Sequence, residues 1–270
     1  MRPRRRFGQH FLAPEWAQKV VDAIAPAADQ TFLEIGPGRG ALTAPLASRA
    51  RRVIAIEIDR DLAAGLQRAA PPNVTIVTGD FLEMDLDALV REWAPSEGLR
   101  IAGNLPYNVS SPILFRLLAV HRATRLLGDA TVMLQREVVE RLAARPGTSE
   151  YGVLTVLARL HADVETLLSL PPGAFRPAPN VWSAVARLSF TAPKVTVDAA
   201  LFERFVKGLF SQRRKKVSNA LKPLCKDPAS AAPFLSAAGI DPGRRPETLD
   251  LPELAALAEL LGSGAGRAVL

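Results

Sequence analysis

The stretch Glu34-Ile35-Gly36-Pro37-Gly38-Arg39-Gly40 decides the fold, because it joins the end of an apolar run to the start of a helical pattern. Three glycines at alternate positions let a bound group approach the backbone closely, as in nucleotide-binding turns. The preceding run, residues 31–35, has the length and composition of a buried strand. We therefore expect a strand, a glycine-rich turn and a helix, the first unit of a parallel sheet.

Further apolar runs rich in branched residues alternate with helical patterns downstream. The expected strands are residues 31–35, 53–58, 74–77, 99–102 and 131–134, and the expected helices are residues 59–69, 112–120 and 137–144. Two later runs, residues 162–168 and 184–190, can add a closing hairpin to the same sheet. This alternation is typical of an α/β fold with a parallel, Rossmann-like sheet.

The character of the sequence changes near residue 193. Asp198 can cap a helix whose apolar residues recur at helical spacing. These residues are Leu201, Phe202, Phe205, Val206, Leu209 and Phe210. No strand alternation follows, so we place the domain boundary at residue 192, between an α/β domain (1–192) and a smaller all-helical domain (193–270).

The composition narrows the class of protein. The 270 residues are 48% hydrophobic, which is enough to fill a core. Neither a membrane span nor a secretory signal is apparent, and the single cysteine, Cys225, cannot form an internal disulfide. We therefore expect a cytoplasmic protein. We also expect no metal site, because the chain has a single cysteine and its three histidines lie far apart in the sequence. A net charge of +7 favours polyanionic partners.

Two carboxylates follow the next two expected strands. Glu57 ends the run 53–58, where it can accept hydrogen bonds from both hydroxyls of a ribose. Asp80 follows the run 74–77 and can accept hydrogens from the amine of a base. Either acid alone is more often a loop residue or a helix cap. Together with the glycine turn they indicate a nucleoside-containing ligand, and the acid before the first glycine favours a methyltransferase loop over a dinucleotide loop.

The tetrapeptide Asn104-Leu105-Pro106-Tyr107 follows the fourth expected strand. The Asn104 side-chain oxygen and the backbone carbonyl near Pro106 can both accept hydrogens from an amine, and Tyr107 offers a flat face to a base. Two acceptors that hold the hydrogens out of plane would return the lone pair to nitrogen, so positioning could supply most of the rate. Taken alone, the tetrapeptide would be an ordinary turn.

These residues resemble the ribosomal RNA adenine dimethyltransferases, and the likeness runs nearly end to end. The other segments that carry it are Phe7-Gly8-Gln9-His10-Phe11-Leu12, Leu134-Gln135-Arg136-Glu137-Val138, Tyr151-Gly152, residues 175–183, residues 212–216 and residues 239–247. The resemblance implies a class I methyltransferase sheet and S-adenosylmethionine as cofactor. It also implies dimethylation of the N6 amines of two adjacent adenines near the 3′ end of small-subunit ribosomal RNA, during subunit assembly.

The resemblance further implies roles for individual residues. The N-terminal segment, residues 1–20, is expected over the cofactor. The implied cofactor-binding residues are His10, Leu12, Gly36, Gly38, Glu57, Asp80 and Asn104, and the implied catalytic residues are Asn104, Pro106, Tyr107 and Phe175. Tyr107 and Phe175 would clamp the target base between two rings. From the residues alone, Phe175 beside several prolines could equally be a loop anchor in the core.

A basic segment lies in the helical domain. Residues 194–222 hold eight basic side chains and two acidic ones, and Arg213, Arg214, Lys215 and Lys216 are consecutive. Such a cluster can neutralise phosphates, although a lone charge run is usually a solvated surface. In a chain with a base-modifying site we expect these four residues to bind RNA. The expected partners are ribosomal RNA and the small-subunit precursor, with the protein as a monomer.

Two alternatives stay open at this point. One is the related family that methylates adenine in large-subunit ribosomal RNA and confers macrolide resistance. Leu105 and the segment 239–247 favour the small-subunit family over it. The other is a non-catalytic RNA-binding assembly factor. The residues that argue against it are the intact Glu57, Asp80, Asn104 and Tyr107.

Overall fold

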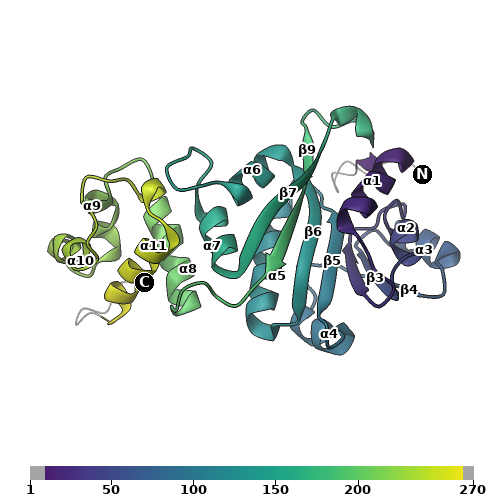
Figure 1. Cartoon of the computed structure of the whole chain (residues 1–270), viewed down its shortest axis with the longest axis horizontal. Coiled ribbons are helices and arrows are strands. Elements are labelled where there is room, and N and C mark those ends of the chain that lie inside the picture. The colour runs from purple at the N-terminus through teal and green to yellow at the C-terminus, as the bar shows by residue number, and fades with distance from the viewer. Residues whose placement is uncertain (1–9, 264–270) are drawn as a thin grey trace. The chain divides into compact units, whose positions relative to one another are not determined.

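The computed structural model describes residues 10–263 and divides into two compact units (Figure 1). The first unit runs to Val139 and includes Asp163–Phe190. The second consists of Glu140–Ala162 and the chain from Thr191 onward. The division differs from the single expected boundary at residue 192, because residues 140–162 group with the C-terminal part of the chain.

The first unit is built around a seven-stranded sheet in the order β4-β3-β2-β5-β6-β9-β7. Neighbouring strands from β4 to β6 are parallel, and β9 runs antiparallel to β6. The strand order reverses between β2 and β5, so the carboxyl ends of these strands border a crevice where α/β folds bind ligands. The strands are β2 (Thr31–Ile35), β3 (Arg52–Glu57), β4 (Val74–Thr78), β5 (Leu99–Asn104), β6 (Leu127–Gln135), β7 (Ala162–Leu170) and β9 (Ser183–Phe190).

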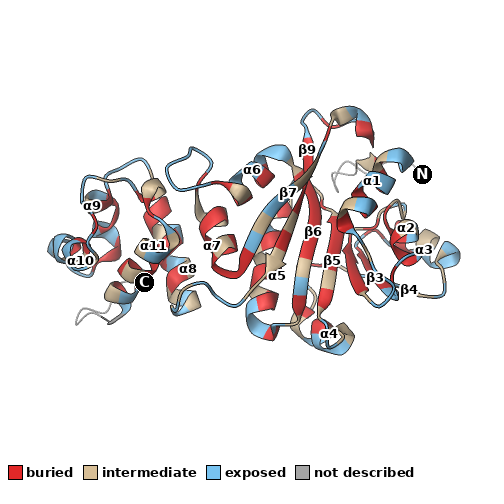
Figure 2. Cartoon of the chain, viewed as in Figure 1, coloured by how far each residue is buried: buried red, intermediate tan, exposed pale blue. Residues whose placement is uncertain are grey.

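The expected Rossmann-like sheet and its closing hairpin are confirmed. Every residue of β2 is buried, as expected for a parallel strand covered on both faces, and Figure 2 shows the central strands mostly buried. β6 begins at Leu127, four residues before the expected run. Gly128 and the charged Asp129 interrupt the apolar pattern at the start of β6. In the structure Asp129 forms an ion pair with Arg100 of β5 at 2.7 Å, so this charge is compatible with a strand.

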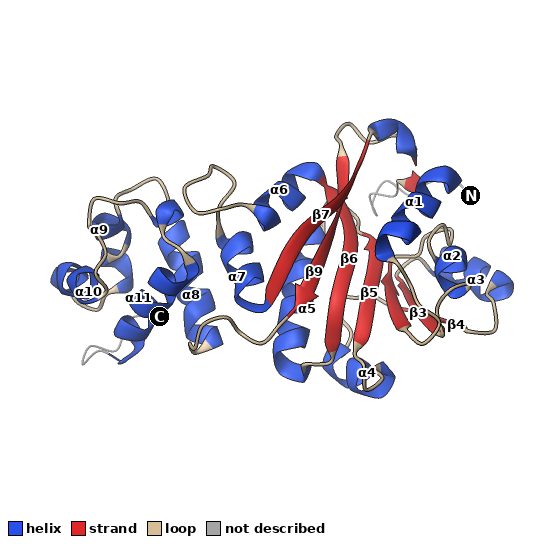
Figure 3. Cartoon of the chain, viewed as in Figure 1, coloured by secondary structure: helices blue, strands red, loops and turns tan. Residues whose placement is uncertain are grey.

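Helices flank this sheet (Figure 3). They are α1 (Pro14–Ile24), α2 (Thr43–Ala47), α3 (Arg60–Ala69), α4 (Leu86–Trp93), α5 (Ser110–Thr124) and α6 (Arg136–Ala143). The three expected helices correspond to α3, α5 and α6. Helices α1 and α4 were not predicted from the sequence. In α4, Asp85 accepts a hydrogen bond from the Ala88 N–H and caps the helix.

A second, two-stranded sheet joins two distant segments. β1 (Phe11–Leu12) pairs antiparallel with β8 (Phe175–Arg176), and the short 3₁₀ helix η2 (Pro172–Ala174) precedes β8. The Ala13 N–H also donates to the Ala174 carbonyl at 2.9 Å. Strands of two residues carry no periodic signal, so the sequence did not predict this sheet. It fixes the start of the described chain beside the carboxyl end of the large sheet.

The described elements of the second unit that follow Thr191 are all helical. Asp198 caps α8 as expected, accepting from the Leu201 N–H at 2.7 Å. Backbone bonds from Thr191 to His161 and from Lys194 to Leu160 join this part to α7, which explains why residues 140–162 belong to it. The elements are α7 (Val153–His161), α8 (Ala199–Phe210), α9 (Val217–Ala220), η3 (Lys222–Leu224), η4 (Pro228–Ser230), α10 (Ala231–Ala237), η5 (Pro246–Thr248) and α11 (Leu251–Ser263).

Candidate active site

The glycine turn after β2 adopts the conformation that its sequence requires. Gly36 and Gly38 have φ angles of +66° and +61°, a region that residues with a side chain rarely occupy. A Cβ atom on Gly36 would meet nothing within 4 Å, whereas one on Gly38 would lie 3.4 Å from the Phe11 ring. The backbone at Gly36 is therefore open to a bound group, and Gly38 lies beneath the N-terminal strand.

Glu57 connects this turn to the end of β3. One carboxylate oxygen accepts from the Gly38 N–H at 2.9 Å, and the other accepts from the Asp59 N–H at 2.9 Å. Its side chain is buried, and burial raises the pKa of the carboxyl above its ordinary value. Each ionised oxygen has a further lone pair, so Glu57 can hold the turn and still accept two hydroxyl hydrogens.

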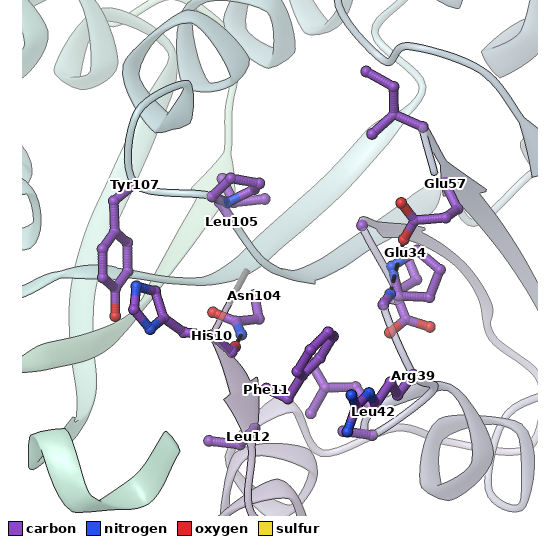
Figure 4. A pocket seen from close by; sticks show the side chains of 16 residues that line it. His10, Phe11, Leu12, Glu34, Arg39, Leu42, Glu57, Asn104, Leu105 and Tyr107 are labelled. Carbon is purple, nitrogen blue, oxygen red and sulfur yellow. Dashed lines mark hydrogen bonds between the residues drawn. The ribbon is translucent and has the colours of Figure 1, made fainter. Parts of the chain in front are cut away.

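Two adjoining pockets lie at this edge of the sheet, and both include Gly36, Ile58 and Pro106. Asp80 lines the second pocket, where its side chain accepts from the Leu82 N–H at 2.9 Å. Figure 4 shows the first pocket from close by. Of the residues singled out in the sequence, the first pocket brings together His10, Leu12, Gly36, Gly38, Glu57, Asn104, Pro106 and Tyr107.

The Asn104 side chain is oriented by the N-terminal segment. Its Nδ2 donates to the His10 carbonyl at 3.0 Å, which leaves Oδ1 as the group available to accept a hydrogen (Figure 4). The Pro106 carbonyl accepts from the Val109 N–H at 3.1 Å and keeps a second lone pair. Gly103 lets β5 approach β2 here, because a Cβ atom on it would lie 2.7 Å from the Ile35 carbonyl oxygen.

Tyr107 is held at both ends. Its hydroxyl shares a hydrogen bond of 2.6 Å with Ser183, and burial raises the pKa of the phenol. The His10 ring stacks on the Tyr107 ring with centroids 5.5 Å apart and planes inclined by 22°. His10 Nδ1 also donates to the Pro177 carbonyl at 2.8 Å. The sequence did not predict that His10 would cover one face of Tyr107.

Phe175 lies elsewhere, so the expected clamp of Tyr107 and Phe175 is absent from this structure. The Phe175 side chain is fully buried in the core cluster that also contains Leu12, and it lines neither pocket. The register of the two-stranded sheet, which pairs Phe175 with Leu12, accounts for this position. The loop-anchor interpretation, which the sequence left open, describes the observed placement.

Glu34 is a site residue to which the sequence analysis gave no role. It lines the first pocket with 1% of its surface exposed, and Oε2 has no hydrogen-bond partner in the described structure. Burial raises the pKa of this carboxyl to about 7, and the nearby charge of Glu57 acts in the same direction. The acid before the first glycine was the available signal, but its burial could not be read from its position in the motif.

The raised pKa of Glu34 predicts a pH-dependent stability. The folded carboxyl keeps its proton up to about pH 7, whereas the unfolded one loses it near 4.5, so this stabilising contribution is complete below 4.5 and lost as the pH rises through 7. We expect the ionisation of Glu34 to lower the free energy of unfolding by roughly 2 to 3 kcal/mol as the pH rises from 5 to 8. Urea titrations should show a flatter pH dependence for Glu34→Gln than for wild type or the exposed control Glu83→Gln. Equal slopes would contradict the assignment.

The basic segment lies in the second unit and is not uniform. Arg213 pairs with Glu247 at 3.3 Å and donates to the Ser149 carbonyl at 2.7 Å. Arg214, Lys215 and Lys216 are exposed in the turn between α8 and α9. Three of the four expected RNA-binding side chains are thus directed to solvent, while Arg213 connects parts of its own unit.

Other sequence expectations concern metals, membranes and the first nine residues. Within residues 10–263, no cluster of three or more histidine, cysteine or acidic side chains is arranged to hold a metal ion. Over the same range, no helix combines the length and apolar character needed to cross a bilayer. Phe7, Gly8 and Gln9 of the N-terminal motif lie outside the described residues.

Comparison with protein families gives one match that spans most of the chain. A family model described as ribosomal RNA adenine dimethylase matches residues 1–253. A protein of Acidobacterium capsulatum named ribosomal RNA small subunit methyltransferase A is 45% identical over 257 residues, covering 93% of this chain and 89% of the relative. A protein of the same name from Chromohalobacter salexigens is 46% identical over 261 residues, covering 94% and 90%.

Solved structures show the same fold. A dimethyladenosine transferase from Plasmodium falciparum is similar with a TM-score of 0.75 and 24% identity, over 95% of this chain and 99% of that one. The 23S rRNA methyltransferase ErmE is similar with a TM-score of 0.66 and 26% identity, over 92% and 98%. These likenesses cover nearly the whole chain, including the helical part.

Proposed function

Because this chain belongs to the ribosomal RNA adenine dimethylase family, we propose that it dimethylates the N6 amines of two adjacent adenines near the 3′ end of small-subunit ribosomal RNA. The observation that carries the proposal is that Asn104, Pro106 and Tyr107 line the same pocket as Glu57. The names of the relatives support the small subunit as target.

The residues of the two pockets fit S-adenosylmethionine. Gly36 leaves open space beside its backbone, Glu57 keeps acceptor positions for ribose hydroxyls, and Asp80 lines the adjoining pocket, where it can accept from the amine of an adenine. The cofactor would supply an electrophilic methyl group on a sulfonium. We therefore assign the ribose to Glu57 and the cofactor base to the second pocket.

The chemistry at the target amine is one of positioning. Asn104 Oδ1 and the Pro106 carbonyl each have a free acceptor position, so together they can hold the two amine hydrogens out of the ring plane. A bound sulfonium would supply the methyl group to this lone pair and keep the electrons of the broken C–S bond on its sulfur, and the amine proton would then pass to solvent water. A monomethylated amine still has one hydrogen and a lone pair, so the same acceptors serve a second transfer.

Tyr107 would stack on the target base, and its hydrogen bond to Ser183 fixes the ring plane. His10 covers one face of that ring in the structure. The base must therefore use the opposite face or displace the His10 side chain. Since Phe175 is buried in the core, Tyr107 is the aromatic residue that we assign to base stacking.

Two measurements test this proposal together. Calorimetry should show one S-adenosylmethionine site per chain, and tritium from the labelled methyl group should appear in unmethylated small ribosomal subunits. Transfer to large subunits instead would favour the alternative large-subunit methyltransferase, and the 23S rRNA methyltransferase ErmE has a similar fold. Cofactor binding without transfer to either subunit would favour the RNA-binding assembly factor.

The exposed basic side chains predict a salt-dependent RNA affinity. Replacing Arg214, Lys215 and Lys216 with alanine should weaken RNA binding and flatten the slope of log Kd against log salt by about 2 units for a single strand. Arg213→Ala is the matched comparison, because this side chain is held by Glu247 and Ser149. Arg213→Ala should lower the free energy of unfolding of the helical unit and change the salt slope little. An unchanged slope in the triple variant would show that these side chains form an ordinary solvated surface and do not bind RNA.

A further inference from the structure

An aromatic side chain outside both pockets is unusually exposed. Trp182 is 49% exposed and its neighbour Val181 is 42% exposed, and among the described large apolar side chains only Ile58 of the pocket is comparable. Exposed apolar side chains of this size beside a functional site often mark a surface that a partner covers. The remaining tryptophans, Trp16 and Trp93, are only partly exposed.

The loop that carries Trp182 is fixed to the active site at both ends. At its start, the Pro177 carbonyl accepts a hydrogen bond from the His10 ring. At its end, Ser183 shares a hydrogen bond with the Tyr107 hydroxyl, and the Trp182 carbonyl accepts from the Arg136 N–H at 2.9 Å. Trp182 is therefore held at the rim of the site, one residue from the group that orients Tyr107.

The chemistry of this rim suits an unpaired base better than a protein partner. Arg136 and Arg176, which border the loop, are exposed, and the chain carries a net charge of +7. Aromatic rings beside basic side chains bind single-stranded nucleic acid by stacking on bases. When a target base leaves its stack to enter a pocket, the base next to it loses a stacking partner. An indole ring at the rim can replace that partner.

We infer that Trp182 stacks on an unpaired base of the substrate RNA that flanks the target adenine. This inference rests on the proposed function, because the flanking position is defined by an adenine in the pocket of Asn104 and Tyr107. It assigns Trp182 a binding role and no part in the transfer step.

The first test uses the fluorescence of Trp182 alone. In the double variant Trp16→Phe/Trp93→Phe, acrylamide should quench the emission of the free protein, and a single-stranded RNA oligonucleotide containing two adjacent adenines should quench it and protect it from acrylamide. Weak acrylamide quenching before RNA is added would show that another part of the protein covers the ring and would overturn the inference. Unchanged emission at RNA concentrations that saturate binding would overturn it too.

The second test separates stacking from general binding. Trp182→Ala should raise the Kd for this RNA by about 5- to 160-fold, as expected for the loss of one base–aromatic stack. Trp182→Phe should recover most of the affinity, and the neighbouring Val181→Ala should change it little. The Kd for S-adenosylmethionine without RNA should match the wild type in all three variants, which shows that they are folded.

The outcomes distinguish failure of this inference from failure of the proposed function. An equal loss in Trp182→Ala and Val181→Ala would indicate a nonspecific apolar surface, and an unchanged RNA affinity in Trp182→Ala, with altered binding to intact subunits, would indicate a protein partner. Either result overturns the inference and leaves the methylation assay unaffected. Quenching by RNA without methyl transfer would overturn the proposed function while keeping Trp182 as a base-stacking residue.

Discussion

Asn104→Ala should lower kcat for methyl transfer by at least about 10²- to 10³-fold, comparable to the loss of one group that stabilises a transition state in other enzymes. The reason is geometric. Asn104 Nδ2 is bonded to the His10 carbonyl, so Oδ1 is the acceptor that the side chain offers to the amine. Without it, the amine lone pair stays delocalised in the ring. Single-turnover kinetics with saturating RNA and S-adenosylmethionine would measure the effect.

The control for Asn104→Ala is Gln67→Ala, which removes an exposed amide side chain of α3 that lines neither pocket. It should leave kcat within about twofold of wild type, because substitutions of exposed residues away from the pockets and the core have small effects. The Kd for RNA should be nearly the same in both variants. If Asn104→Ala keeps full activity, the two-acceptor mechanism is wrong.

Glu57→Gln should raise the Kd for S-adenosylmethionine by about 10- to 150-fold, the usual range for one lost hydrogen bond to a charged group. The glutamine keeps the length of the side chain, but its amide nitrogen cannot accept a ribose hydroxyl or the Gly38 or Asp59 N–H that the carboxylate accepts now. The effect should appear in the affinity for the cofactor more than in kcat at saturating cofactor.

Calorimetry with S-adenosylmethionine and with S-adenosylhomocysteine would measure this loss. Both ligands carry the same ribose, so Glu57→Gln should weaken both to a similar degree. Glu83→Gln, which changes an exposed acid outside the pockets, should weaken neither. If folded Glu57→Gln protein binds both ligands as tightly as wild type, Glu57 does not bind the ribose.

Much of the fold could be predicted from the sequence because its signals are local. The run before Gly36 is mainly apolar, and every residue of β2 is buried. Asp198 is a cap before a periodic helix, and the hydrogen bond from Leu201 is present. The start of β6 and the grouping of residues 140–162 depend on partners elsewhere in the chain, such as Arg100 for Asp129, and no local pattern records them.

The candidate site was predictable at the level of residues but not of contacts. The ends of β3 and β5 bring Glu57, Asn104 and Tyr107 to one pocket, as parallel topology requires. The stacking of His10 on Tyr107 depends on the pairing of two-residue strands, which also places Phe175 in the core. The roles of these residues remain predictions until the variants are measured.

The most direct test of the central claim is mass spectrometry of adenosines from both ribosomal RNAs, after unmethylated small and large subunits are incubated with the protein and S-adenosylmethionine. Our account predicts N6,N6-dimethyladenosine in the small-subunit RNA, confined to two adjacent positions near its 3′ end. Modification confined to large-subunit RNA would contradict the proposed substrate, and no methylated adenosine in either RNA would contradict the proposed chemistry.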